Sequence, residues 1–183
     1  EGVGVVDACG DGFLARRLRG RRVAIASGPP NGTWQEYTVV DAKRAVAMPD
    51  RIADEQAAMF FVNPITTYVM IREVLKVRRG GWVLITAAGS ALGKSVVRMG
   101  RRDGFRTICV VRSSANTASL AALGADAVIE TDHQDLVAEV ARITGGRGVG
   151  YALDCVGGEL TGEVVRCLGL DGRLVIYGTL ADS

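Results

Sequence analysis

The stretch from Trp82 to Arg112 limits the possible folds of this chain more than any other part of the sequence. It opens with an apolar run at residues 82–87 that contains β-branched residues and is bounded by glycines, which is typical of a buried strand. Small residues follow at 88–93, then apolar residues at helical spacing and a second apolar run at 107–111. The order strand, turn, helix, strand predicts a βαβ unit.

The turn of this unit has the composition of a phosphate-binding loop. Small residues let the backbone approach a pyrophosphate, and the N-terminus of the next helix offers free N–H groups and a partial positive charge. The pattern G-x-G-x-x-G would place glycine at 88, 90 and 93, of which this chain keeps only the last. We predict that the turn binds a dinucleotide through Ala88, Gly89, Ser90, Ala91, Leu92 and Gly93.

The end of the second strand indicates which dinucleotide binds. Units that bind NAD usually carry Asp or Glu here, about 20 residues after the glycines, to accept hydrogen bonds from the ribose. This chain instead reads Val111-Arg112-Ser113-Ser114, without an acid. A guanidinium pairs with a 2′-phosphate and hydroxyls hydrogen-bond it, so we predict NADP(H), bound by Arg112 and Ser113. The alternative is a solvated arginine at a strand end.

Strands and helices continue to alternate after Arg112. Helices are expected at 117–123, 136–144 and 160–168, and strands at 127–129, 149–156 and 173–177. Five strands alternating with helices predict an α/β fold with a parallel, doubly wound sheet. Ligands bind at the carboxyl ends of the strands in such sheets. This adds further residues to the predicted cofactor site: Val156, Gly157, Tyr177 and Gly178.

The first 50 residues predict a different, β-rich structure. Strands are expected at 3–8, 23–26 and 45–47, and the alternating run from Trp34 to Val40 predicts another, with Trp34 in a core or a domain interface. The turn signal at 28–32 separates two of them.

The pattern changes to helical after residue 50. A helix that begins at Asp54 is interrupted by Asn63-Pro64 and resumes with Tyr68 expected in the core. We therefore divide the chain into domains at 1–52 and 53–183.

Composition narrows the possible partners. The 183 residues are 48% hydrophobic with a net charge of +2, and no run of 18 apolar residues or signal peptide is visible, so we expect a cytoplasmic protein without a membrane partner. The basic cluster at 16–22 is read as a solvated loop rather than a nucleic-acid site. Zinc sites use closely placed cysteine and histidine ligands, whereas this chain has four widely spaced cysteines and the single His133, so no metal is expected.

Several short motifs, taken in order, resemble the medium-chain dehydrogenase/reductase superfamily, which joins a GroES-like β domain to a Rossmann domain. They are Glu1-x-x-Gly4 followed by Gly10, Gly32-Thr33-Trp34-Gln35-Glu36-Tyr37, Leu123-Gly124-Ala125-Asp126 and Asp154-Cys155-Val156-Gly157-Gly158. The segment Asn63-Pro64-Ile65-Thr66-Thr67-Tyr68 is similar to that of the zinc-independent quinone reductase and 2-enoyl thioester reductase branch.

The resemblance implies a partial GroES-like domain at 1–52 and a Rossmann NADP(H)-binding domain at 53–183 that lacks its last strand. Asn63 stands where zinc alcohol dehydrogenases have a cysteine ligand, which implies a zinc-free site. The resemblance also implies an NADPH-dependent oxidoreductase that transfers hydride to an enoyl thioester, an enone or a quinone. Thr67 would touch the nicotinamide and Asn63 would line the same pocket, as the candidate catalytic residues. Helix capping and packing are the alternative for both.

The resemblance places the proton donor in a segment before Glu1, so no residue here inherits that role. Family members are often dimers, which makes a homodimer possible. Three other functions stay open: a non-catalytic NADPH-binding module, a zinc-type alcohol dehydrogenase-like protein, and a methyltransferase of similar topology. An acid at the end of the second strand is expected for the methyltransferase, and Arg112 argues against it.

Overall fold

The computed structural model describes residues 1–26 and 32–182. The chain folds as two compact units, Glu1–Thr66 and Thr67–Ser183. The first unit extends beyond the predicted boundary at 52 and 53 because helix α2 (Asp54–Ala58) packs in it, where Ala57 joins Ala24 and Met48 in a small core. Most of the predicted turn at 28–32 lies outside the described residues.

The first unit is built on an antiparallel sheet. Strand β2 (Arg22–Ile25) lies between β1 (Gly2–Val5) and β3 (Ala45–Ala47), which confirms the three predicted strands, the first in shorter form and the second shifted by one residue. The predicted loop at 16–22 is partly a short helix, α1 (Phe13–Leu18), which buries Leu18 and leaves its arginines exposed. A 3-10 turn at Ala42–Arg44 precedes β3.

The prediction of a strand from Trp34 to Val40 is wrong. The segment has no regular structure, and the side chains of Trp34 and Val39 are fully or almost fully exposed. A strand needs a hydrogen-bonded neighbour, and no strand within the described residues pairs with this segment. Because this segment is not part of a sheet, its alternating apolar side chains have no buried face to pack against.

The second unit begins within helix α3 (Asn63–Tyr68), which continues as a π-helical segment at Val69–Val74. Thr67, Met70 and Ile71 share its buried face at spacings of three and four residues. Tyr68 is 51% exposed, so its predicted place in the core is wrong. It lies one residue beyond Thr67, and one residue turns a helix by about 100°, away from that face.

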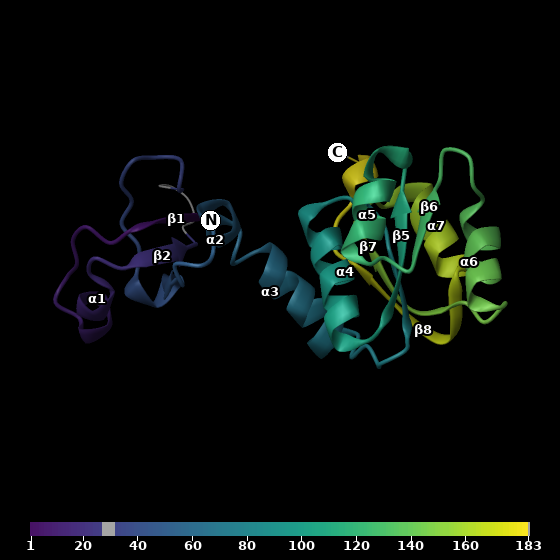
Figure 1. Ribbon diagram of the computed structural model, residues 1–183, viewed down its shortest axis with the longest axis horizontal. Helices are drawn as coiled ribbons and strands as arrows, with labels where there is room; N and C mark the ends of the chain where they lie inside the picture. Colours follow the sequence, from purple (N-terminus) through teal and green to yellow (C-terminus); the bar gives the residue numbers. More distant parts are fainter. Residues whose placement is uncertain (27–31, 183) are drawn as a thin grey trace. The chain divides into compact units, whose positions relative to one another are not determined.

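The second unit contains the predicted sheet. Five parallel strands lie in the order β6-β5-β4-β7-β8, with helices on both faces (Figure 1). The strands are β4 (Trp82–Ile85), β5 (Arg106–Val111), β6 (Ala127–Glu130), β7 (Val149–Asp154) and β8 (Leu168–Ile176). This confirms the doubly wound, Rossmann-type α/β fold.

Two hydrophobic cores cover the two faces of this sheet. Helices α4 (Ala91–Asp103) and α5 (Thr117–Leu123) pack on one face together with the π-helical segment. Helices α6 (Leu136–Thr144) and α7 (Gly158–Arg166) pack on the other. Because all five strands are parallel, their carboxyl ends meet at one edge of the sheet, where ligands of such folds bind. No helix in the described part of the chain is long and apolar enough to cross a membrane.

Candidate cofactor site

The turn after β4 ends in a capped helix. The Ser90 hydroxyl accepts a hydrogen bond from the Gly93 N–H at 3.1 Å, and the Ser90 carbonyl accepts one from the Lys94 N–H at 2.9 Å. The N–H groups of Ala91 and Leu92 are left without an intrahelical acceptor, as at the start of any helix. They point out of the positive end of the α4 dipole, which suits an anion.

Close packing against backbone at Gly93 and against a side chain at Gly89 explains the glycines of this turn. A Cβ on Gly93 would lie 2.4 Å from the Ala88 carbonyl oxygen, so the start of α4 approaches the turn as closely as a glycine allows. A Cβ on Gly89 would lie 2.6 Å from the Asn116 side chain. Ala87 adopts the left-handed conformation, with φ 45°. The turn is therefore a tight cradle, which fits a pyrophosphate held by backbone groups.

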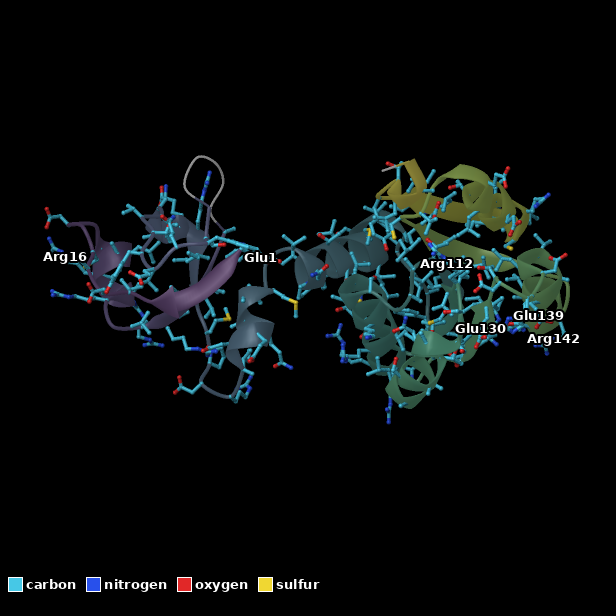
Figure 2. All side chains as sticks on the ribbon, turned by 90° about the horizontal axis from the view of Figure 1, so that it is seen from above. Glu1, Arg16, Arg112, Glu130, Glu139 and Arg142 are labelled. Atoms are coloured by element: carbon cyan, nitrogen blue, oxygen red, sulfur yellow. The ribbon has the colours of Figure 1, made fainter. Side chains whose placement is uncertain are left out.

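Arg112 stands at the end of β5, and its side chain is exposed (Figure 2). Its carbonyl accepts a hydrogen bond from the Asp132 N–H at 3.0 Å, which joins the ends of β5 and β6. None of the ion pairs between described residues involves this guanidinium. Ser113 follows and is also exposed, ahead of a 3-10 turn at Ser114–Asn116. An exposed guanidinium beside a hydroxyl suits a phosphate monoester.

A cavity of about 250 Å³ opens at this edge of the sheet. It gathers residues from the ends of β4, β5, β6 and β7, as the topology predicts for a ligand site. The lining includes two predicted cofactor residues, Arg112 and Val156. The other lining residues are Ala87, Val110, Val111, Thr131, Leu160, Leu180 and Ala181.

Several of these lining residues carry no sign of a ligand site in the sequence. Leu160 is one of the apolar residues at helical spacing in 160–168, a pattern that predicts packing of the helix against the sheet and does not indicate a cavity. Leu180 and Ala181 reach the edge because their N–H groups donate to the carbonyls of Cys155 and Val156, at 3.0 and 2.7 Å. No local signal in the sequence reveals such a return of the chain.

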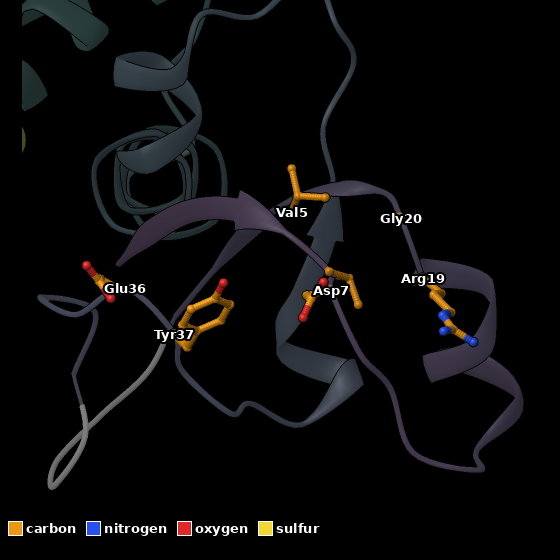
Figure 3. A pocket seen from close by; sticks show the side chains of 7 residues that line it. Val5, Asp7, Arg19, Gly20, Glu36 and Tyr37 are labelled. Carbon is orange, nitrogen blue, oxygen red and sulfur yellow. The ribbon is translucent and has the colours of Figure 1, made fainter.

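Larger hollows exist in the first unit. One of about 700 Å³ has a lining that includes Val5, Asp7, Arg19, Glu36 and Tyr37 (Figure 3). None of the predicted cofactor residues lies there. Its lining mixes both charge signs and offers no helix N-terminus, so it lacks the features that bind a dinucleotide phosphate.

Asp154 ends β7 and is completely buried. Burial disfavours its charge, but hydrogen bonds from Thr161, from Thr86 and from the N–H groups of Val156 and Gly157 outweigh burial, so the pKa of Asp154 lies below its usual value. Gly157 has φ 83°, a conformation that favours glycine. The predicted site residues Val156 and Gly157 are thus held by a buried carboxylate.

Tyr177 and Gly178 follow β8 directly. The Tyr177 N–H donates to the Asp154 carbonyl at 2.8 Å, and a Cβ on Gly178 would lie 3.2 Å from the Cys155 carbonyl oxygen. The Tyr177 hydroxyl is buried next to the Cys155 thiol, and burial, together with that neighbour, raises the pKa of Tyr177.

The two candidate catalytic residues lie in different units. Asn63 begins α3 in the first unit and is partly buried, whereas Thr67 is buried in the second. The role predicted for the pair at a nicotinamide stays a prediction.

The described residues contain no group of three or more His, Cys, Asp or Glu side chains that could hold a metal ion. His133 is exposed, and its Nε2 lies 3.5 Å from a carboxylate oxygen of Glu130 (Figure 2 labels Glu130). Glu130 also accepts a hydrogen bond from the Thr117 hydroxyl at 2.6 Å. These contacts give both side chains a structural role.

Residues 91–183, half of the chain, match the family described as "Zinc-binding dehydrogenase", and the chain belongs to this family. Its relatives are enoyl reductases and quinone oxidoreductases, the branch of the medium-chain dehydrogenase/reductase superfamily that the sequence resembles. The mitochondrial enoyl-[acyl-carrier-protein] reductase of Dictyostelium discoideum is 28% identical over 186 residues, which cover 99% of this chain and 53% of that protein.

Solved structures agree with this placement. The quinone oxidoreductase of Pseudomonas syringae pv. tomato is 30% identical with a TM-score of 0.89, and the match covers 98% of this chain and 55% of that one. The Escherichia coli quinone oxidoreductase, solved with NADPH, is 27% identical with a TM-score of 0.88 and coverages of 97% and 54%. This chain therefore spans about half the length of the relatives it matches.

Proposed function

We propose that this chain belongs to an NADPH-dependent oxidoreductase that transfers hydride to an activated C=C bond or a quinone. The observation that carries the proposal is the cavity at the carboxyl edge of the sheet. Its lining combines the exposed Arg112 with Ala87, which lies in the turn before α4 and directly precedes the predicted segment Ala88–Gly93, at the edge where the fold family binds dinucleotides. The solved relative that holds NADPH supports the choice of cofactor.

Each part of the site has a proposed task. The segment Ala88–Gly93 holds the pyrophosphate through backbone N–H groups and the helix dipole. Arg112 and Ser113 bind the 2′-phosphate, which separates NADPH from NADH. Thr67, Val156, Gly157, Tyr177 and Gly178 line the rest of the cofactor site. When bound, NADP(H) supplies or accepts the hydride.

The proposed acceptor follows from the same chemistry and from the relatives. Reduction of a simple ketone benefits from a Lewis acid that polarises the carbonyl. A conjugated enoyl thioester, enone or quinone delocalises the incoming charge onto an oxygen that hydrogen bonds can stabilise. The family resemblance adds Asn63 and Thr67 as candidate catalytic residues, with Thr67 expected to contact the nicotinamide, and this role stays a prediction. The printed names of the relatives include enoyl and quinone reductases.

The charge at Arg112 tests the cofactor assignment. Arg112→Asp removes a charge-assisted contact worth about 1.5–3 kcal/mol, so NADPH affinity should fall at least about tenfold while NADH affinity changes little. Arg147→Asp is the matched control, because Arg147 is exposed and precedes the amino end of β7 at the opposite edge of the sheet. Titrations followed by nicotinamide fluorescence report both affinities. Equal losses in the two variants would contradict the assignment.

A second experiment separates an enzyme from a non-catalytic NADPH-binding module. The full-length protein is given NADPH and one acceptor of each class, and oxidation of NADPH is followed by absorbance. Turnover supports the reductase, and tight NADPH binding without turnover of any acceptor supports the module. Location in the cytoplasm, a homodimer and the absence of a nucleic-acid partner stay predictions of the sequence.

A further inference from the structure

The side chain of Asp154 is completely buried, two residues before Val156, which lines the cavity at the carboxyl edge of the sheet. One oxygen of Asp154 accepts hydrogen bonds from the Thr86 hydroxyl at 2.6 Å and the Val156 N–H at 3.0 Å. The other accepts from the Gly157 N–H at 3.4 Å and from the Thr161 hydroxyl. Both oxygens are fully used by the protein, so this side chain has no free atom for a substrate or a cofactor.

These bonds join three elements at the carboxyl edge of the sheet. Thr86 directly follows β4, and its hydroxyl both donates to Asp154 and accepts from the Cys155 N–H at 3.1 Å. Asp154 ends β7, and Thr161 lies in the first half of α7. The carboxylate therefore ties the central strand, its neighbour and the following helix at one point.

The same bonds set one wall of the cavity. Val156 lines the cavity and donates its N–H to Asp154, and Leu160 lines it beside Thr161. The Val156 carbonyl then accepts from the Ala181 N–H at 2.7 Å, which brings another lining residue to the wall. A small shift of the carboxylate would move all of these groups together.

We propose that Asp154, together with Thr86 and Thr161, is the positioning group of the NADP(H) site and holds the Val156–Leu160 wall at the distance that the cofactor requires. The inference rests on the proposed function. The carboxylate touches neither cofactor nor substrate and acts through the backbone of Val156 and Gly157. A carboxylate suits this task because it accepts on both oxygens, whereas an amide would turn an N–H group toward one pair of these donors.

Replacing the threonines by valine tests the proposal, since valine keeps the shape and removes the hydroxyl. We expect Thr86→Val and Thr161→Val to weaken NADPH binding at least tenfold in titrations of folded protein. Thr144→Val is the matched control. Thr144 is as buried as Thr86, whereas Thr161 is only partly buried, and the Thr144 hydroxyl donates to the Val140 carbonyl at 2.7 Å and accepts from the Gly148 N–H at 3.0 Å, before the amino end of β7. This control should change NADPH affinity less than twofold.

A second readout does not depend on the cofactor. Hydrogen exchange of the Val156 and Gly157 amides should be at least tenfold faster in Thr161→Val than in Thr144→Val, and Thr161→Ser should restore the slow exchange. If Thr161→Val matches Thr144→Val in both exchange and affinity, the proposal is overturned. If the wild-type chain fails to bind NADPH while the exchange effect is still seen, the proposed function is wrong. The hydrogen bonds of Asp154 would then still hold the Val156–Leu160 wall in place.

Discussion

The contact between Gly93 and the turn before it shows how one residue sets the candidate site. A Cβ at this position would lie 2.4 Å from the Ala88 carbonyl oxygen, which is backbone and cannot rotate away. Gly93 is the one glycine of the phosphate-binding pattern that stands in register in this sequence. The structure supplies the reason, since only glycine lets α4 begin this close to the turn.

Gly93→Ala tests this contact. The clash should force the turn and the helix apart and lower the free energy of unfolding by about 1–3 kcal/mol, with a matching loss of NADPH affinity. Gly162→Ala is the control, because Gly162 lies inside α7 with no atom within 4 Å of an added Cβ. That substitution should stabilise by roughly 0.5–1 kcal/mol. Denaturant unfolding and NADPH titration report both quantities, and an equally stable Gly93→Ala protein would contradict the packing argument.

The burial of single side chains was predicted wrongly where their surroundings are formed by distant parts of the chain. Trp34 has the composition of a buried strand residue and is fully exposed. Tyr68 follows the buried Thr67 and faces away from the core. An apolar side chain is more stable when it is buried, but it becomes buried only where the fold provides a surface that covers it.

At the scale of elements, the strands and helices of the second unit were predictable because each carries a complete local signal. The strands read as apolar runs between turn residues, and α4, α5 and α6 end at glycines in the left-handed conformation, namely Gly104, Gly124 and Gly145. Strand β4 is buried on both faces, with Val83 and Ile85 in one core and Leu84 in the other. Such continuous burial gives the strongest strand signal.

A matched pair of leucines tests the difference between the central and the edge strand. Leu84 in β4 is completely buried, whereas Leu170 in β8 is almost fully exposed. Leu84→Ala should lower the free energy of unfolding by about 2–5 kcal/mol through lost contacts and a cavity. Leu170→Ala should change it by no more than about 0.5 kcal/mol. Urea unfolding followed by circular dichroism gives both values, and equal losses would show that β8 is covered in solution.

For the whole molecule, the two units differ in the size of their cores. The first unit has small clusters, such as the one formed by Leu18, Val23 and Ile25. The second has two extended cores that cover both faces of its sheet. A larger buried apolar surface gives greater resistance to local opening, so the second unit should be the more stable.

Hydrogen exchange of the intact chain tests this difference. The amides of β4, β5 and β7 should exchange more slowly than those of β1, β2 and β3. NADPH at 100 times its dissociation constant should stabilise the unit that binds it by about 2.7 kcal/mol and slow exchange further in the second unit. Slower exchange confined to the first unit on addition of NADPH would place the cofactor elsewhere and contradict the site.

The sequence alone determined the order of elements in the second unit, the parallel sheet and the cationic end of β5, and it predicts a ligand site at the carboxyl edge of that sheet. These features follow from local periodicity, turn residues and the handedness of βαβ connections, all of which act over a few neighbouring residues. Only the tertiary structure decided that α2 packs in the first unit, that Trp34 is exposed, that Leu180 and Ala181 return to the cavity and that Asp154 joins three elements. Each of these depends on contacts between residues far apart in the chain, which no local pattern records.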